Sequence, residues 1–269
     1  MELFQQIVLG IIQGITEWIP VSSEGFLLFF ITNFFGGIEV DLFLRQALFL
    51  HLGTFFAALV YFRKEIKQLL KGVANYKYSD PETKRTLKFL MIATLISGVV
   101  GLAILNLLDL VKIQQLPLTS ASINFFIGFL LILTGALQLK SRSAGHRREY
   151  HLNNTDGVVL GIMQGFAALP GLSRSGLTVS SFLFRNFDET IALRLSFIMS
   201  LPIILLGNLL LNFSDIVFMK EMFFGFLFSF IFGLGTIHMF MKFSEKVRFG
   251  HFVITFGLLA ILAGIINVL

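Results

Sequence analysis

The 269-residue chain contains no cysteine. It therefore has neither disulfides nor thiolate chemistry, and cysteine usage gives no indication of its redox compartment. Charged residues are also scarce, at 14%, whereas apolar residues make up 55% of the chain and mean hydropathy is +0.83. A water-soluble domain of this size could hardly remain in solution with that balance. The composition predicts an integral membrane protein, which we expect to be all-α and to reside in the cell membrane.

No lysine or arginine precedes Arg45, so the N-terminal region lacks the basic segment of a cleavable signal peptide. We expect the mature chain to start at Met1. A membrane-spanning helix needs about 20 apolar residues. Six stretches meet this requirement: 41–62, 87–108, 120–139, 188–212, 222–241 and 251–268. Two further apolar regions, 2–35 and 157–185, are each interrupted near the middle.

Basic residues are concentrated in three connections between the predicted spans. There are eight in 63–88, four in 140–148 and three in 242–248, against one each in 33–45, 109–119 and 213–221. The positive-inside rule places the three basic connections in the cytoplasm. This topology explains the basic clusters without a nucleic acid, so we expect no nucleic-acid partner. It also requires both interrupted regions to be re-entrant helical hairpins, entering from opposite sides, and both termini to lie outside.

The two interrupted regions share a sequence pattern. LGIIQGITEWIPVSSEG (9–25) and LGIMQGFAALPGLSRSG (160–176) are identical at seven of seventeen positions without gaps, and the matches include glutamine, serine and glycine. Chance similarity between apolar segments would favour leucine and isoleucine instead. We interpret the pattern as an inverted-topology repeat of about 1–139 and 140–269 within a single membrane domain, the arrangement from which transporters and channels build sites near the bilayer midplane.

Each interrupted region contains a proline that stops a half-helix, Pro20 or Pro170, followed by glycines and serines that begin a second one. Irregular backbone at membrane depth is tolerated only where protein or trapped water covers it, so we expect the two breaks to line a buried cavity. The N-terminus of a half-helix favours an anion. The glycine pairs Gly10/Gly14 and Gly161/Gly165 are better explained by close helix packing.

Three ionisable residues lie inside the membrane in this interpretation: Glu17 and Glu24 in the first break and Arg174 in the second. Such groups are functional candidates, although an internal Glu–Arg pair could also merely neutralise itself. Arg174, flanked by Ser173 and Ser175, suits a phosphate group because guanidinium binds phosphoryl oxygens bidentately. Glu17 could hold a divalent cation or act as acid or base.

These motifs resemble the undecaprenyl-diphosphate phosphatase family, also called UppP or BacA. The resemblance rests on PGLSRSG (170–176) and on the E-x-x-P-V-S-S-x-G pattern (17–25), and it extends to HLGT (51–54) and SFIMSLP (196–202). It implies an integral-membrane enzyme that removes the terminal phosphate of an undecaprenyl-type polyprenyl diphosphate at the outer face of the membrane, using a divalent cation. The implied partners are this lipid and the membrane; a homodimer is left open.

The resemblance implies roles for individual residues. Glu17 matches the second glutamate of the acidic motif, and Ser22 and Ser23 match its serine pair. Ser173, Arg174 and Thr178 match the phosphate-binding segment of the family. We expect Ser175 and Gln13 to bind phosphate as well. Ser23 is either a nucleophile or a hydrogen-bond donor.

Three positions depart from the family pattern. Gln13 stands where the first acidic residue is expected, Glu24 replaces a threonine, and Phe26 replaces a histidine. Glu24 restores a second carboxylate, so a metal such as Mg²⁺ or Ca²⁺ bound by Glu17 and Glu24 is expected. His51, in the first span, either substitutes for the missing imidazole or is a packing residue.

A structural or interaction membrane protein with a decayed site is one alternative, against which the intact PGLSRSG argues, and two functions use the predicted site itself. The first is hydrolysis of a polyprenyl diphosphate to the monophosphate and inorganic phosphate, which recycles the glycan carrier lipid. The second is a transporter or flippase of polyprenyl phosphate, which would need no proton shuttle and therefore tolerates Phe26. We favour the enzyme.

Overall fold

A computed structural model describes residues 2–36, 40–110, 119–141, 145–169, 171–211, 220–243 and 249–268, and these residues form helices and no extended strand. The α-helices are α1 (Leu3–Thr16), α2 (Ser23–Phe34), α3 (Val40–Tyr61), α4 (Arg63–Ala74), α5 (Pro81–Leu110), α6 (Ser120–Lys140), α7 (Asn154–Phe166), α8 (Arg174–Phe184), α9 (Glu189–Leu211), α10 (Lys220–Phe243) and α11 (Phe249–Ile266). Short 3₁₀ turns cover Tyr76–Tyr78 and Glu149–His151. The prediction of an all-α membrane protein is confirmed.

Five helices, α3, α5, α6, α9 and α10, are long and apolar enough to cross a membrane. The sixth predicted span, 251–268, coincides with α11, a shorter apolar helix. Helix α5 begins six residues before the predicted span 87–108, because Asp80 caps it: the Asp80 side chain accepts a hydrogen bond from the Thr83 N–H at 2.8 Å. Hydrogen bonds with Thr83 hold the pKa of Asp80 below its usual range.

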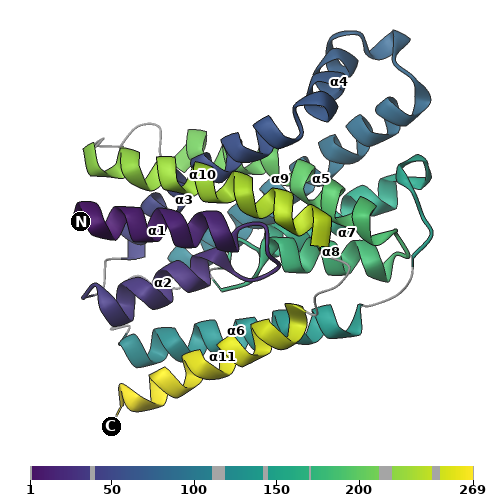
Figure 1. Cartoon of the computed structure of the whole chain (residues 1–269). Helices are drawn as coiled ribbons and strands as arrows, with labels where there is room; N and C mark the ends of the chain where they lie inside the picture. The colour runs from purple at the N-terminus through teal and green to yellow at the C-terminus, as the bar shows by residue number, and fades with distance from the viewer. Residues whose placement is uncertain are drawn as a thin grey trace.

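The helices pack in pairs that cross between the two halves of the chain. Helix α1 runs along α10, α7 runs along α5, and α3 contacts both α10 and α9. Helices α6 and α11 form a further pair, side by side along the lower edge of the molecule in Figure 1. The short helices α1 and α7, which carry the repeated sequence pattern, are therefore each supported by a long helix from the other half.

Glycines permit this close pairing. A Cβ atom at Gly10 of α1 would lie 2.3 Å from the Gly225 carbonyl oxygen of α10, and one at Gly14 would lie 2.7 Å from the Gly233 nitrogen. In the second repeat, a Cβ at Gly161 would lie 2.8 Å from the Ala93 carbonyl oxygen of α5. The predicted packing role of these glycines is confirmed.

Replacing Gly10 by alanine should lower the melting temperature of the detergent-solubilised protein, because the added methyl group forces α1 away from α10. Overpacking of this kind costs about 1–3 kcal/mol. The matched control is Gly98→Ala in α5, where nothing lies within 4 Å of the added Cβ and helix propensity improves. Equal melting temperatures for the two variants would contradict the close α1–α10 packing.

Both repeated segments are broken where the sequence predicts. Helix α1 ends at Thr16 and α2 begins at Ser23, leaving the first break at residues 17–22. Helix α7 ends at Phe166 and α8 begins at Arg174, leaving the second break at 167–173. The predicted role of Pro170 lies outside the described residues, but Gly171 beside it has φ +104°, a conformation that favours glycine.

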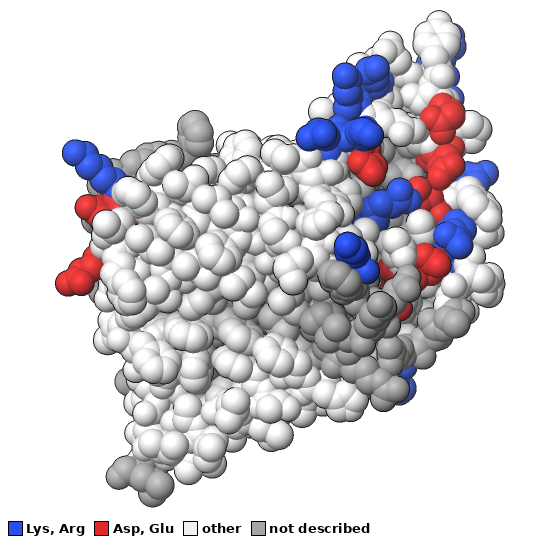
Figure 2. Space-filling model, viewed as in Figure 1, with Lys and Arg blue, Asp and Glu red and all other residues white. Residues whose placement is uncertain are grey.

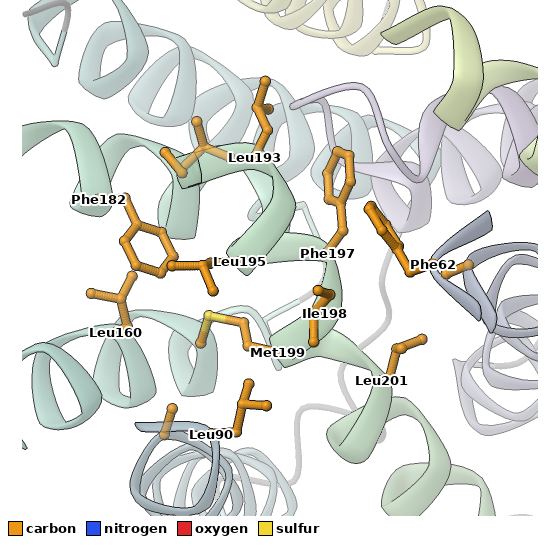
Figure 3. Packing of buried hydrophobic residues seen from close by; sticks show 14 of the residues in the cluster. Phe62, Leu90, Leu160, Phe182, Leu193, Leu195, Phe197, Ile198, Met199 and Leu201 are labelled. Carbon is orange, nitrogen blue, oxygen red and sulfur yellow. The ribbon is translucent and has the colours of Figure 1, made fainter. Parts of the chain in front are cut away.

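A large apolar core includes residues of α7 and α8, the two helices on either side of the second break. It joins residues of α3, α5, α7, α8 and α9; in Figure 3, Phe182 lies near Leu195 and Leu160, and Phe197 lies beside Phe62. Trp18 of the first break packs edge-on against Phe197, with ring centroids 5.0 Å apart. The first break is therefore anchored in the same core as the second hairpin.

Charged side chains gather at one end of the helix bundle, and both termini lie at the opposite end (Figures 1 and 2). At the charged end, the fully buried Asp156 at the start of α7 pairs with Arg147, with Nη2 to Oδ2 at 2.7 Å, and with Arg185. Arg185 follows the last residue of α8. These ion pairs join the N-terminal end of α7 to the C-terminal end of α8.

Candidate active site

The two helix breaks face each other across a cavity that leaves about 290 Å³ of space unfilled by protein atoms, part of it open to the outside. The lining residues come from both breaks and from α3: Glu17, Val21, Ser22, Ser23, Glu24, His51, Ala167, Leu172, Arg174 and Ser175. The structure thus brings together seven of the ten predicted site residues. Of the other three, Gln13 donates a hydrogen bond to Glu17, Ser173 caps α8, and Thr178 bonds to Ser196 of α9.

Glu17 is the centre of the polar contacts around this cavity. It directly follows α1 and is only 4% exposed. Its Oε2 accepts hydrogen bonds from Gln13 Nε2 at 2.8 Å and from Ser23 Oγ at 2.9 Å, and it lies 3.1 Å from His51 Nε2. Its Oε1 pairs with Arg174 Nη2 across the two breaks. The predicted meeting of a carboxylate and a guanidinium is confirmed.

His51 reaches the cavity from α3 and is 9% exposed. Its Nδ1 lies 2.6 Å from the Ala47 carbonyl oxygen, which can only accept, so Nδ1 carries a proton. Its Nε2 faces the Glu17 carboxylate, and a bond there also requires a proton. His51 and Glu17 therefore share a proton between them, an arrangement suited to proton transfer.

Arg174 is the first residue of α8, and its side chain is 14% exposed. Besides Glu17, it contacts the Ser196 carbonyl oxygen of α9 at 3.5 Å through Nη1. Thr178, one turn along α8, bonds to the Arg174 carbonyl oxygen at 2.8 Å and to Ser196 Oγ at 2.6 Å. Thr178 thus fixes the first turn of α8 against α9 and does not line the cavity.

Ser22 and Ser173 occupy equivalent positions and cap the second half-helix of each repeat. Ser22 Oγ accepts from the Gly25 N–H at 3.1 Å, and Ser173 Oγ accepts from the Gly176 N–H at 3.0 Å. Ser22 lines the cavity, whereas Ser173 does not. The sequence pattern, which is the same at both positions, gives no sign of this difference.

Glu24 also lines the cavity, and no hydrogen bond or ion pair to it occurs within the described part of the chain. Within these residues no group of three or more His, Cys, Asp or Glu side chains is arranged to hold a metal ion. Both oxygens of Glu17 are already engaged. A divalent cation would be held by Glu24 together with phosphate oxygens, a donor set that Mg²⁺ accepts, and by a Glu17 oxygen once Arg174 moved away from it; it would neutralise phosphate charge.

Phe26, which replaces the histidine of the family pattern, is absent from the cavity lining. Its ring stacks on Phe256 of α11, with centroids 3.7 Å apart and planes at 9°. Phe26 joins α2 to the α6–α11 pair, packing with Ile127 and Leu131. The imidazole nearest to the Glu17 carboxylate comes instead from His51 of α3.

Two residues with contacts at the site were not predicted. Ser196 meets both Arg174 and Thr178, and it lies within the SFIMSLP segment that carried part of the resemblance. Gln138 of α6 donates a hydrogen bond from Nε2 to the Pro20 carbonyl oxygen of the first break. A glutamine near the end of an apolar span was the only signal for Gln138.

Comparison with known proteins identifies the family. The family of bacitracin resistance protein BacA matches residues 6–265, nearly the whole chain. The chain belongs to this family. Similar proteins from Methanococcoides burtonii and Methanothrix thermoacetophila are 39% and 35% identical over 97% of this chain, covering 98% and 96% of their own lengths. One from Methanococcus maripaludis is 31% identical over 96% of both chains. All three are named undecaprenyl-diphosphatase.

Proposed function

We propose that this BacA-family protein hydrolyses an undecaprenyl-type polyprenyl diphosphate to the monophosphate and inorganic phosphate. The observation that carries the proposal is the Glu17–Arg174 pair between the two breaks, with the Ser23 hydroxyl on the same carboxylate. The names of the relatives support the substrate class. The reaction would recycle the carrier lipid for glycan synthesis.

Arg174 and Ser22 are the groups suited to hold the diphosphate. The guanidinium can bind two phosphoryl oxygens, and the Ser22 hydroxyl, whose oxygen accepts from Gly25, retains its proton for a phosphate. Binding would draw Arg174 from Glu17 toward the phosphate and so release one carboxylate oxygen. Positive charge near the transferring phosphoryl group also stabilises the transition state.

Ser23 is the proposed nucleophile. Its hydroxyl donates to Glu17 at 2.9 Å, so the carboxylate is placed to take the proton as the oxygen attacks the terminal phosphorus. The new O–P bond forms as the bond to the bridging oxygen breaks, and polyprenyl phosphate leaves. Water then hydrolyses the phosphoserine and restores Ser23. The proton shared with His51 is available to the departing groups.

The proposed topology is six spans plus two re-entrant hairpins, α1–α2 and α7–α8, in an inverted repeat of about 1–139 and 140–269. The reciprocal pairing of α1 with α10 and of α7 with α5 supports it. Both termini at one end and most of the visible basic residues at the other are consistent with termini outside and a cytoplasmic basic end (Figure 2). The site would then open toward the outer face of the cell membrane.

The test is phosphate release by the purified protein from polyprenyl diphosphates of several chain lengths. We expect steady turnover, a monophosphate product, and no turnover by Ser23→Ala. A parallel vesicle assay measures translocation of polyprenyl phosphate, the activity of the alternative transporter. Translocation without phosphate release would reject the enzyme in favour of the transporter.

The variant Glu24→Gln should weaken the dependence of turnover on divalent cations, because it removes a carboxylate charge that has no hydrogen-bond or ion-pair partner among the described residues, while the shape of the side chain is kept. A drop in cation affinity of about tenfold or more is expected for loss of a charged ligand. Calorimetric titration of the cation into protein with a non-hydrolysable diphosphate checks this. The control is Glu2→Gln at the exposed start of α1. An unchanged titration would remove Glu24 as a ligand.

A further inference from the structure

Three successive carbonyl groups in the first break, those of residues 19–21, accept hydrogen bonds from side chains of α6, of the second break and of α8. The bonds run from Ser175 Oγ to Ile19 at 3.1 Å, from Gln138 Nε2 to Pro20, and from Ser173 Oγ to Val21 at 2.9 Å. Carbonyl groups released by a helix break need partners inside a membrane. We call this set of donors, Gln138, Ser173 and Ser175, the tip clasp.

The hydroxyl group of Ser173 has no proton left for a further acceptor. A serine hydroxyl has one proton to donate and two lone pairs that accept. The proton goes to the Val21 carbonyl oxygen, and the oxygen accepts from the Gly176 N–H at 3.0 Å and lies 3.3 Å from Ser175 Oγ. A phosphate group needs a donor, and Ser173 has none left. The same holds for Ser175, whose proton goes to Ile19.

Gln138 depends on the missing side chain at Gly176. A Cβ atom at Gly176 would lie 2.7 Å from Gln138 Nε2, so only glycine leaves room for the amide to pass α8 and reach Pro20. Gly176 therefore serves the clasp twice, since its N–H also bonds to Ser173. The serine–arginine–serine–glycine run thus acts mainly on the other break.

We propose that Ser173, Ser175 and Gln138 are positioning residues that fix the first break, and that they are not phosphate ligands. The loop they hold begins at Glu17 and leads into Ser23, so its conformation sets the distance between carboxylate and hydroxyl. Arg174 alone of this run touches the reacting groups. The catalytic consequence rests on the proposed phosphatase function, but the positioning of the first break does not.

The single tryptophan of the chain reports directly on the clasp. Trp18 lies in the first break, is fully buried, and packs on Phe197. Its emission maximum and its quenching by acrylamide can be measured in phosphate-free buffer, where loss of a phosphate ligand would have no effect. Steady-state kinetics on a polyprenyl diphosphate then give kcat and KM for the same preparations.

The variants are Ser173→Ala and Gln138→Leu, and their matched control is Ser181→Ala in α8, whose hydroxyl donates to the Leu177 carbonyl oxygen of its own helix at 2.7 Å. We expect a red shift and faster quenching of Trp18 in the clasp variants alone. Their kcat should fall about tenfold with KM within about twofold, as expected for loss of one hydrogen bond that acts through geometry. Ser173→Thr, which keeps the hydroxyl, should restore both readouts.

Unchanged Trp18 emission in both clasp variants would overturn the proposal, as would weaker binding of inorganic phosphate to Ser173→Ala with normal emission, since that result marks a ligand. If the wild-type protein releases no phosphate while the clasp variants still shift Trp18, the proposed function fails and the clasp stands. The two failures are therefore distinguishable.

Discussion

Replacing Arg174 by lysine is expected to reduce phosphate release from a polyprenyl diphosphate by about a hundredfold or more, although the positive charge is kept. The guanidinium contacts Glu17 with one nitrogen and the Ser196 carbonyl oxygen with the other. A lysine ammonium group is a single point of charge and cannot replace two donors in a fixed plane. Both kcat and kcat/KM should fall, because the lost contacts grow stronger in the transition state.

The matched control is Arg148→Lys, because Arg148 lies at the charged end, is half exposed, and contacts Asp188 only at 3.8 Å. It should retain wild-type kinetics. Thermal unfolding of both variants separates catalysis from folding. If Arg174→Lys turned over substrate at the wild-type rate, bidentate recognition by Arg174 would be wrong. Arg174 would then act only as a counter-ion to Glu17.

The sequence was sufficient to predict where the helices break and that the breaks meet. Pro20 interrupts the helix and Ser22 caps the half-helix that follows, and irregular backbone in a membrane must be covered by protein. With acids in one repeat and the base in the other, an encounter between Glu17 and Arg174 followed from charge alone. These arguments need only local chemistry and the length of a membrane span, and a sequence carries both.

Other features depended on packing that no local pattern encodes. Ser22 and Ser173 occupy equivalent positions of the repeat, yet one lines the cavity and the other bonds to Val21. Gln138 is 118 residues from Pro20, and their contact depends on how α6 lies against the first break. Phe26 turned toward α11 because an apolar partner, Phe256, was available there. Such choices are settled by tertiary contacts.

The variant Glu17→Gln should lower kcat by about a thousandfold, the scale expected when a general base is removed. Glutamine keeps the shape of the side chain but cannot take the Ser23 proton, and it no longer balances Arg174 and His51. Since Glu17 is 4% exposed, loss of its charge should also destabilise the protein by about 3–5 kcal/mol. Phosphate release and denaturant unfolding are measured on the same preparation.

A double-mutant cycle with His51→Gln tests whether His51 contributes to turnover through Glu17 or independently of it. If His51 acts only through the proton it shares with Glu17, the double variant should be no slower than Glu17→Gln alone, because removing either residue already breaks the relay. If the rate losses of the two single variants multiply in the double variant, His51 works independently of Glu17. His238, which packs against Tyr61 and lies outside the cavity lining, provides the control substitution His238→Gln. It should leave turnover unchanged, so that a loss specific to His51 identifies the imidazole that the family pattern expects at position 26.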